Sequence, residues 1–347
     1  MSRRFPLLPS FTYTGCRYFC SKSTPQENVI FVGIEPNGPM HIGNYYGVFK
    51  NCVTLQNSGC SVRCSVGDML SMAIPAKSPP LQESILLTTA CLIGCGIKPE
   101  KSTIFLQSQI PQLSQLCWVL GCLTDLTELP KNQKDVPLGS YLRSLLQTAD
   151  ILLNKSSHVC IGYEKLFQLP LVYNLAKKYN EKYGETFHHP VPIINAAVNF
   201  KDLRQPSMKM SKSNGSEKGK INLTDPPDVV LSKIRKAVTD MTSKITYEPD
   251  ARPGVSNLVA IHSAVTNKTP EELCLEAANL DTDKYKSRVA EALIESMKPF
   301  NHRINELLKD KAYLATVLDD GTKKASNFAE QTWISVHEKI GSCVARQ

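Results

Sequence analysis

The residues with the clearest chemical potential lie in a short polar segment, SMKMSKSNGS, at residues 207–216. It holds Lys209 and Lys212 three positions apart and has too few apolar side chains to build a core. Most short charged loops are simply solvated, so the segment by itself does not decide its own role. Two lysines on a mobile loop could also balance the charge of a polyphosphate, chiefly in a transition state, where such stabilisation accelerates a reaction.

A second candidate for phosphate chemistry is the turn in FVGIEPNGPMHIGN, residues 31–44. A β-branched strand at 28–34 ends there, and a helix is predicted to begin near Gly43. In open α/β sheets, ligands bind beyond the carboxyl ends of the strands, where helix N-termini present free N–H groups. Gly38 and Gly43 permit a close approach of the backbone, and His41 can donate a hydrogen bond to a phosphate or carry charge there. The turn therefore predicts a phosphate site, although the Walker-type GxxxxGK[ST] motif is absent.

The elements that must position these residues alternate between strands and helices along the first two thirds of the chain. Such alternation predicts an α/β fold with a Rossmann-like parallel sheet and helices on both faces. Pro170 should kink the helix that contains it or delay its start. Strands are expected at 28–34, 61–68, 102–107 and 158–162, helices from Gly43, at 81–96, at 140–153 and near 163–182, and an extended segment at 188–198.

The pattern changes in the last third of the chain, where the periodicity is helical and no convincing strand is found. DPPDVVLSKIRKAVTDM, residues 225–241, starts with a double proline, which a helix N-terminus tolerates. TPEELC, residues 269–274, has a threonine cap, a proline in the first turn and a glutamate three residues on, which together form a capping box. We therefore predict an α/β domain at 28–220 followed by an all-helical domain at 221–347.

The charge of the chain is concentrated at its beginning. The net charge is +8, of which the first 26 residues contribute Arg3, Arg4, Arg17 and Lys22 and no acid, so that the remainder carries +4. A segment rich in Arg, Ser and aromatic residues, without acids and without a continuous hydrophobic centre, is typical of a mitochondrial presequence, although an ordinary disordered tail is the alternative. We predict a presequence at 1–26 and a location in the mitochondrial matrix.

Composition excludes several other classes of protein. Apolar residues make up 42% of the chain and charged residues 21%, which is ordinary for a globular protein. No window contains the roughly 20 consecutive apolar residues that a membrane-spanning helix needs. The twelve cysteines include no CxxC pair, which favours structural thiols in a reducing compartment over disulfides or a metal site.

The two phosphate-type segments also carry a resemblance to a known family. HIGN at 41–44 and KMSKS at 209–213 resemble, in that order, the HIGH and KMSKS signatures of class I aminoacyl-tRNA synthetases. From residue 30 to nearly its end, the chain is similar to bacterial and mitochondrial tryptophanyl-tRNA synthetases. The stretches that carry this similarity are GIEPNGPMHIGNYYG, TADILL, KIRKAVTD and PGVSNLVAIHSA, and the last two distinguish it from the tyrosyl relatives.

The resemblance implies a reaction and a set of site residues. Tryptophan and ATP would give tryptophanyl-adenylate and pyrophosphate, and the acyl group would then pass to tRNA(Trp). Asp150 is expected to accept a hydrogen bond from the indole N–H, which is a donor only, and Lys165 falls in the tryptophan site. The expected catalytic residues are His41, Asn44, Lys209 and Lys212, and the expected ATP-binding residues are Glu35, Pro36, Asn37, His41, Ile42, Gly43, Asn44, Gly162, Tyr163, Glu164, Phe200, Lys209, Met210, Ser211, Lys212 and Ser213.

The sequence departs from the family pattern in three places. GYEK at 162–165 replaces a Gly-Glu-Asp-Gln stretch whose Gln helps to hold the substrate amine. A lysine there repels an ammonium by roughly 4 kcal/mol at 4 Å for an effective dielectric constant near 20, so Lys165 must swing out, pair with Glu164 or another acid, or lose its proton. Leu70 stands where the family has a His, and Glu35 where it has a Gln. Mg²⁺, expected with ATP, could bridge the Glu35 carboxylate and the phosphates.

These observations leave two functions open. The first is a working mitochondrial synthetase with a rebuilt amino-acid pocket, which the intact HIGN and KMSKS segments favour. The second is a catalytically impaired synthetase-fold paralogue that acts as an RNA-binding or regulatory module, which the altered pocket favours. The helical region resembles the anticodon-binding part of the family, where Lys233, Arg235, Lys236 and Lys244 offer phosphate contacts unless they are simply solvated. The similarity also implies a homodimer.

Overall fold

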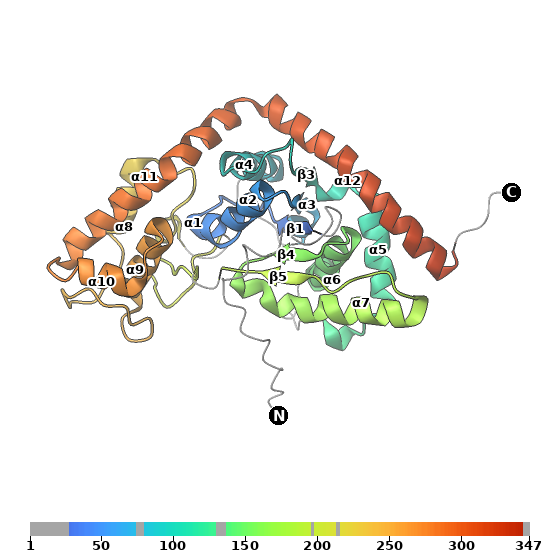
Figure 1. The fold of residues 1–347 in the computed structure, drawn as a ribbon, viewed down its shortest axis with the longest axis horizontal. Helices are drawn as coiled ribbons and strands as arrows, with labels where there is room; N and C mark the ends of the chain where they lie inside the picture. Colours follow the sequence, from blue (N-terminus) through green and yellow to red (C-terminus); the bar gives the residue numbers. More distant parts are fainter. Residues whose placement is uncertain (1–27, 74–79, 130–136, 196–197, 213–215, 343–347) are drawn as a thin grey trace.

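The computed structural model describes residues 28–73, 80–129, 137–195, 198–212 and 216–342. The expected presequence and Ser213 therefore lie outside the described residues. The centre of the molecule is a parallel sheet with strand order β3-β2-β1-β4-β5 (Figure 1). The strands are β1 (Val29–Ile34), β2 (Ser61–Val66), β3 (Thr103–Leu106), β4 (His158–Cys160) and β5 (Val191–Ile193).

The residues of β1 explain why the sheet has helices on both faces. Ile30, Val32 and Ile34 belong to one buried cluster and Phe31 to another, because successive side chains of a strand point to opposite faces. The predicted fold class is thus confirmed. One face packs against α2 (Lys50–Asn57) and α4 (Leu81–Gly94), and the other against α5 (Pro111–Gly121), α6 (Leu138–Leu153) and α7 (Leu169–Tyr183).

Local sequence signals set where the helices of this half begin. The helix expected near Gly43 begins as α1 (Ile42–Asn44) and passes through a π-helical turn at Tyr45–Phe49 into α2. Pro170 lies in the first turn of α7, where a missing N–H costs no hydrogen bond, and a 3₁₀ turn at Tyr163–Gln168 precedes it. The predicted late start of this helix is therefore confirmed. The remaining short elements are α3 (Asp68–Met72) and 3₁₀ turns at Gln107–Gln109, Leu126–Glu128 and Glu217–Gly219.

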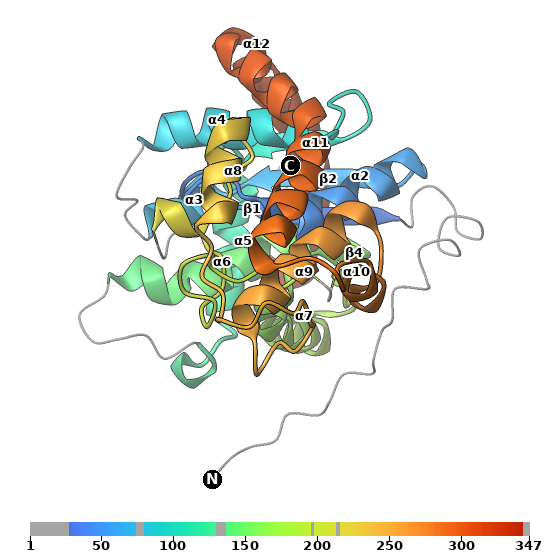
Figure 2. The same ribbon diagram turned by 90° about the vertical axis from the view of Figure 1, so that its left-hand side faces the viewer.

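Within the described residues after 220, every element longer than one turn is a helix, as predicted. Thr269 and Glu272 form the expected capping box. Two long helices arch across the molecule, and three shorter ones lie at one end of the arch (Figures 1 and 2). The helices are α8 (Pro227–Arg235), α9 (Pro253–Thr266), α10 (Pro270–Glu276), α11 (Thr282–Lys309) and α12 (Lys311–Ile340). None of the helices described is long and apolar enough to cross a membrane.

The last helix, α12, covers the edge of the sheet at β3. Leu314 and Val317 join the cluster on one face of the sheet, whereas Ala325 and Ala329 join the cluster on the other face. At the crossing point, a Cβ atom on Gly321 would overlap the carbonyl oxygen of Ile104. A glycine therefore lets the helix lie against the backbone of an edge strand that would otherwise expose its hydrogen-bonding groups.

Replacing Gly321 by alanine should destabilise the protein. The new methyl group can be accommodated only if α12 shifts away from β3, which should lower the free energy of unfolding by about 1–3 kcal/mol. Chemical denaturation of the purified chain measures this loss. Gly139→Ala is the matched control, because a Cβ there lies at an ordinary 3.5 Å from the Cβ of Ala73 and should leave stability unchanged or raised. Equal stabilities for the two variants would contradict the packing argument.

Candidate functional site

Backbone pairing brings the two phosphate-type segments together from distant parts of the sequence. The N–H of Ile42 donates to the carbonyl of Ile221 at 3.0 Å, and the N–H of Leu223 donates to the carbonyl of Met40 at 2.8 Å. The chain that leaves the lysine segment therefore runs antiparallel to the residues that begin the first helix. This pairing holds the helix start and the lysine segment on one side of the molecule.

A second short pairing anchors the other end of the lysine segment. The N–H of Met210 donates to the carbonyl of Phe200 at 3.0 Å. The N–H of Asp202 donates to the carbonyl of Met208 at 2.9 Å. Met210 is only 1% exposed and joins the same core cluster as Phe200. The apolar residue between the two lysines thus anchors the segment in the core, while Lys209 and Lys212 line a cavity.

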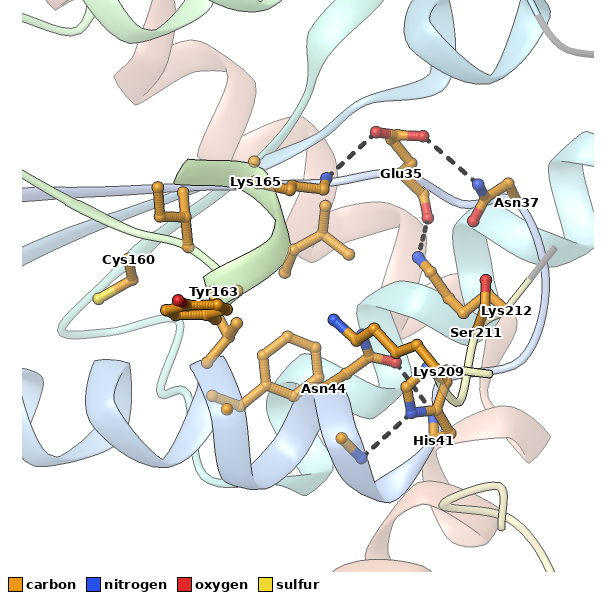
Figure 3. Close-up of a pocket in the computed structure, with 18 of the residues that line it drawn as sticks. Glu35, Asn37, His41, Asn44, Cys160, Tyr163, Lys165, Lys209, Ser211 and Lys212 are labelled. Atoms are coloured by element: carbon orange, nitrogen blue, oxygen red, sulfur yellow. Dashed lines mark hydrogen bonds and ion pairs between the residues drawn. The ribbon is translucent and has the colours of Figure 1, made fainter. Parts of the chain in front are cut away.

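This cavity has a volume of about 840 Å³ and lies at the carboxyl ends of the strands (Figure 3). In the close-up, Lys165 and Lys212 approach Glu35 from two sides, and Lys209 lies next to His41. Such a crevice beyond parallel strands is where α/β folds bind ligands. The charged and polar residues that line it include Glu35, Asn37, His41, Asn44, Arg143, Gln147, Asp150, Tyr163, Lys165, Asn195, Lys209, Ser211, Lys212, Glu217 and Lys220.

His41 caps the first helix as a neutral imidazole. Its Nδ1 accepts a hydrogen bond from the backbone N–H of Gly43 at 3.1 Å, and the backbone N–H of His41 donates to Oδ1 of Asn44 at 3.0 Å. Gly43 is required here, because a Cβ would lie 2.9 Å from the imidazole ring. Burial, together with the charges of Lys212, Lys209 and Lys220, lowers the pKa of His41 to about 3. His41 can therefore donate a hydrogen bond from Nε2 to a phosphate, but it carries no charge at neutral pH.

Glu35 is the centre of the charge network in the cavity. Its Oε2 accepts from Arg143 at 2.6 Å, and its Oε1 accepts from Lys165 at 3.2 Å. Nζ of Lys212 donates to the Glu35 carbonyl oxygen at 2.6 Å. Burial of Glu35 favours the neutral acid, but the positive charges of Lys165, Arg143 and Lys212 outweigh it and hold the pKa at about 2. Of the three expected fates of Lys165, the structure shows pairing with an acid, and that acid is Glu35.

Lys212 is held in the wall of the cavity by its neighbours. Nζ of Lys220 donates to the Lys212 carbonyl oxygen at 3.0 Å and also pairs with Glu217 at 2.7 Å. Burial lowers the pKa of Lys212 to about 8, with Glu35 acting to raise it and Lys165 to lower it. A lysine with this pKa is mostly protonated at neutral pH and loses its charge in mildly alkaline solution.

The pKa of Lys212 predicts a pH dependence. We expect kcat/KM for ATP to fall above about pH 8, approaching tenfold per pH unit, because this quantity reports the free enzyme and only protonated Lys212 balances phosphate charge. Pyrophosphate exchange measured between about pH 6 and pH 10 tests this expectation. Lys212→Arg should lower the rate but remove the alkaline limb, since a guanidinium keeps its proton. An identical limb in that variant would assign the titration to another group.

Asp150 lies deep in the cavity wall, on α6. Its Oδ2 accepts hydrogen bonds from Ser65 Oγ and Gln107 Nε2, both at 2.7 Å, while Oδ1 accepts a longer bond from Asn154 at 3.3 Å. The residue is 3% exposed. Burial raises its pKa to about 6, against the lowering effect of the Ser65 and Gln107 hydrogen bonds. Asp150 is thus a buried acceptor whose less-occupied oxygen is Oδ1.

The structure places most of the sequence-predicted site residues at this cavity. Pro36 does not line it, and Ile42 is fully buried in the core, so neither side chain is positioned to contact a ligand. The side chain of Glu164 lies outside the described residues. The predicted residues that line the cavity are Glu35, Asn37, His41, Gly43, Asn44, Asp150, Gly162, Tyr163, Lys165, Phe200, Lys209, Met210, Ser211 and Lys212.

Sequence reasoning missed Arg143, Gln147 and Lys220. The first two precede Asp150 by seven and three residues, a spacing that places all three on one face of a helix and could have identified them. Lys220 gave no comparable signal, because its position depends on the pairing around Ile221.

In the helical region, Lys233 pairs with Asp225 at 2.6 Å and is mostly buried, which makes it unsuited to the expected phosphate contact.

The charge network does not fit a magnesium ion held by the protein. The Glu35 carboxylate is engaged by Arg143 and Lys165, which would repel a divalent cation. Within the described residues, no group of three or more His, Cys, Asp and Glu side chains could hold a metal ion. The suggested bridging of Glu35 and ATP by Mg²⁺ is therefore not supported by the contacts of Glu35.

A parallel sheet with a neutral helix-capping histidine and two lysines at its carboxyl edge defines a nucleotide-binding α/β protein. The chain belongs to the family described as tRNA synthetases class I (W and Y), whose model matches residues 23–298, and within it to the tryptophan–tRNA ligases. It is 36% identical to the tryptophan–tRNA ligase of Clostridium acetobutylicum over 327 residues, which is 91% of this chain and 97% of that protein.

Solved structures agree with this placement. The crystal structure of tryptophanyl-tRNA synthetase from Mycoplasma pneumoniae matches with a TM-score of 0.78 and 27% identity, covering 90% of this chain and 98% of that one. The Campylobacter jejuni enzyme complexed with ADP and tryptophan matches with a TM-score of 0.74 and 25% identity, covering 90% and 99% of the two chains. The resemblance inferred from HIGN and KMSKS is therefore confirmed.

Proposed function

We propose that this chain activates tryptophan with ATP and transfers it to tRNA(Trp) in the mitochondrial matrix. The observation that carries the proposal is a single cavity that combines His41, Lys209 and Lys212 at one side with the buried acceptor Asp150. The first group suits a triphosphate, and the second suits an indole N–H. Membership of the tryptophan–tRNA ligase family supports the same reaction.

In the proposed reaction, the tryptophan carboxylate attacks the α-phosphorus of ATP. A mixed anhydride forms, the bond between the α-phosphorus and the bridging oxygen breaks, and pyrophosphate leaves with the electron pair. His41 donates a hydrogen bond to a phosphate oxygen, and Lys212 balances the charge that develops on the leaving group. Mg²⁺ would accompany the ATP phosphates, since the Glu35 carboxylate is already engaged by Arg143 and Lys165.

Tryptophan-dependent exchange of pyrophosphate into ATP tests the activation step. We expect the purified chain to catalyse exchange and to charge tRNA(Trp). Lys212→Ala provides the background rate. Exchange no faster than this background, combined with retained binding of tRNA, would instead support an RNA-binding or regulatory module.

The mitochondrial location and the homodimer are further parts of the proposal. The basic, acid-free segment at 1–26 supports import into mitochondria, and fusing this segment to a fluorescent protein tests it. A cytosolic fusion protein would contradict the location. Sedimentation equilibrium tests the dimer, with a mass near twice the 38.5 kDa of one chain as the expected result.

A further inference from the structure

The two carboxylate oxygens of Glu35 have different partners. Oε2 is held by the Arg143 guanidinium at 2.6 Å and receives a weaker bond from Asn37 at 3.4 Å. Oε1 accepts from the Lys165 ammonium at 3.2 Å. The residue is 7% exposed, and its carboxylate lines the cavity. One oxygen is thus anchored by a short, charge-assisted bond, while the other is held by a longer and more exchangeable one.

Lys165 is able to leave this position. It belongs to the short 3₁₀ turn at Tyr163–Gln168 and its side chain is 30% exposed, compared with 9% for Glu35. A lysine side chain is a flexible stem with a strongly hydrated head group, so withdrawal of Nζ into solvent is readily compensated by water. The ammonium of Lys165 on Oε1 is also the same chemical group as the α-ammonium of an amino acid.

Helix α6 carries both Asp150, the buried acceptor, and Arg143, which holds Glu35. Arg143 and Asp150 lie seven residues apart on one face of this helix, which separates them by two turns, or roughly 10 Å. Gln147 lies between them and also lines the cavity. An amino acid lying along this face would direct its ring towards Asp150 and its backbone towards the end where Arg143 holds Glu35.

The charges around Glu35 favour a ligand ammonium that replaces the Lys165 ammonium over one that binds in addition to it. Arg143, Lys165 and Lys212 supply three positive charges around the single negative charge of Glu35. Bringing a fourth cation into this cluster is unfavourable, whereas replacing one ammonium by another leaves the local charge unchanged. A ligand ammonium can therefore occupy Oε1 if Lys165 leaves it.

We propose that Glu35 binds the α-ammonium of the substrate amino acid and that Lys165 occupies this position only while the substrate is absent. This inference rests on the proposed function and adds the recognition of the amine, which the expected Asp150 contact leaves unassigned. Lys165 acts as a built-in competitor, and the substrate binds by displacing it. The ion pair between these residues thereby sets how strongly the pocket discriminates between ligands with and without an ammonium group.

Removing the two partners of this ion pair should have opposite effects. Glu35→Gln should weaken tryptophan binding about 10- to 100-fold, because a charge-assisted hydrogen bond to the substrate is lost. Lys165→Gln should strengthen tryptophan binding roughly 3- to 10-fold, because the bound state no longer has to displace a resident ammonium. An ion pair that only stabilised the fold would weaken binding when either partner is removed. Titration calorimetry on the full-length variants measures both changes.

A ligand without an ammonium group separates recognition from general damage to the pocket. Indole-3-propionate keeps the ring and the carboxylate of tryptophan. The wild-type chain should prefer tryptophan to this analogue, Glu35→Gln should lose the preference, and Lys165→Gln should increase it. Glu128→Gln is the matched control, since Glu128 also pairs with a lysine, Lys178 at 2.7 Å, but does not line the cavity.

The outcomes distinguish this inference from the function on which it rests. A wild-type chain that binds tryptophan, together with a Glu35→Gln variant that keeps the full preference for it over indole-3-propionate, would overturn the role of Glu35 alone. Weaker tryptophan binding by Lys165→Gln would likewise overturn the competitor role. A wild-type chain that binds neither ligand would overturn the proposed function and this inference with it.

Discussion

Lys212→Ala is expected to reduce kcat for tryptophan-dependent pyrophosphate exchange roughly 100- to 1,000-fold, the range seen when one preorganised charge-stabilising donor is removed. The buried Nζ of Lys212 is fixed on the Glu35 carbonyl oxygen at 2.6 Å, next to the helix start that His41 caps. Its charge is therefore in place before pyrophosphate begins to leave. The KM for tryptophan should change much less, because Asp150 and Glu35 are unaltered.

Lys218→Ala is the control for this experiment. Lys218 follows the lysine segment closely in the sequence but is exposed and does not line the cavity. Its removal should leave kcat unchanged. Exchange by Lys212→Ala that equals the wild-type rate, with both rates well above exchange without tryptophan, would contradict the assignment of Lys212 to the leaving phosphate.

Asp150→Asn should weaken tryptophan binding about 100-fold or more while making the ligand-free protein more stable. An amide nitrogen facing the indole N–H would leave two buried donors opposed, which costs a hydrogen bond and the desolvation of both groups. Ligand binding and thermal unfolding measure the two effects. A tryptophan isostere with sulfur in place of the ring N–H should bind poorly to the wild-type chain and about equally to the variant, since only the wild-type site depends on that donor.

The stability gain follows from the raised pKa of Asp150. Burial moves the pKa of the Asp150 carboxyl from 3.8 to about 6, so its ionisation lowers the free energy of unfolding. This loss of stability is absent below pH 3.8 and complete above pH 6. At neutral pH it amounts to about 3 kcal/mol, which the uncharged amide avoids. The amide nitrogen at the Oδ1 position gives up only the long bond from Asn154 Nδ2 at 3.3 Å, which offsets part of this gain. A variant that is less stable at neutral pH would contradict this account.

Much of the fold could be predicted because its signals are local. The strand predicted at 28–34 is observed at Val29–Ile34, and the delayed start of the helix that contains Pro170 is observed at Leu169. Periodicity and proline geometry act over a few residues, so a sequence reveals them directly. The course of α12 is different, because its packing on β3 depends on the fit of Gly321 against a strand more than 200 residues earlier.

The site, like the fold, combines features that the sequence reveals with features that only the tertiary structure decides. The sequence alone indicated a nucleotide-binding crevice, through HIGN, KMSKS and the strand–helix alternation. Phosphate chemistry requires particular residue types at short spacings, and a sequence shows these directly. The partners of Glu35 were decided by tertiary structure alone. Arg143 from α6 and Lys165 from the turn after β4 meet this carboxylate only because the helices and strands pack together, and ion pairs between distant residues leave no local pattern.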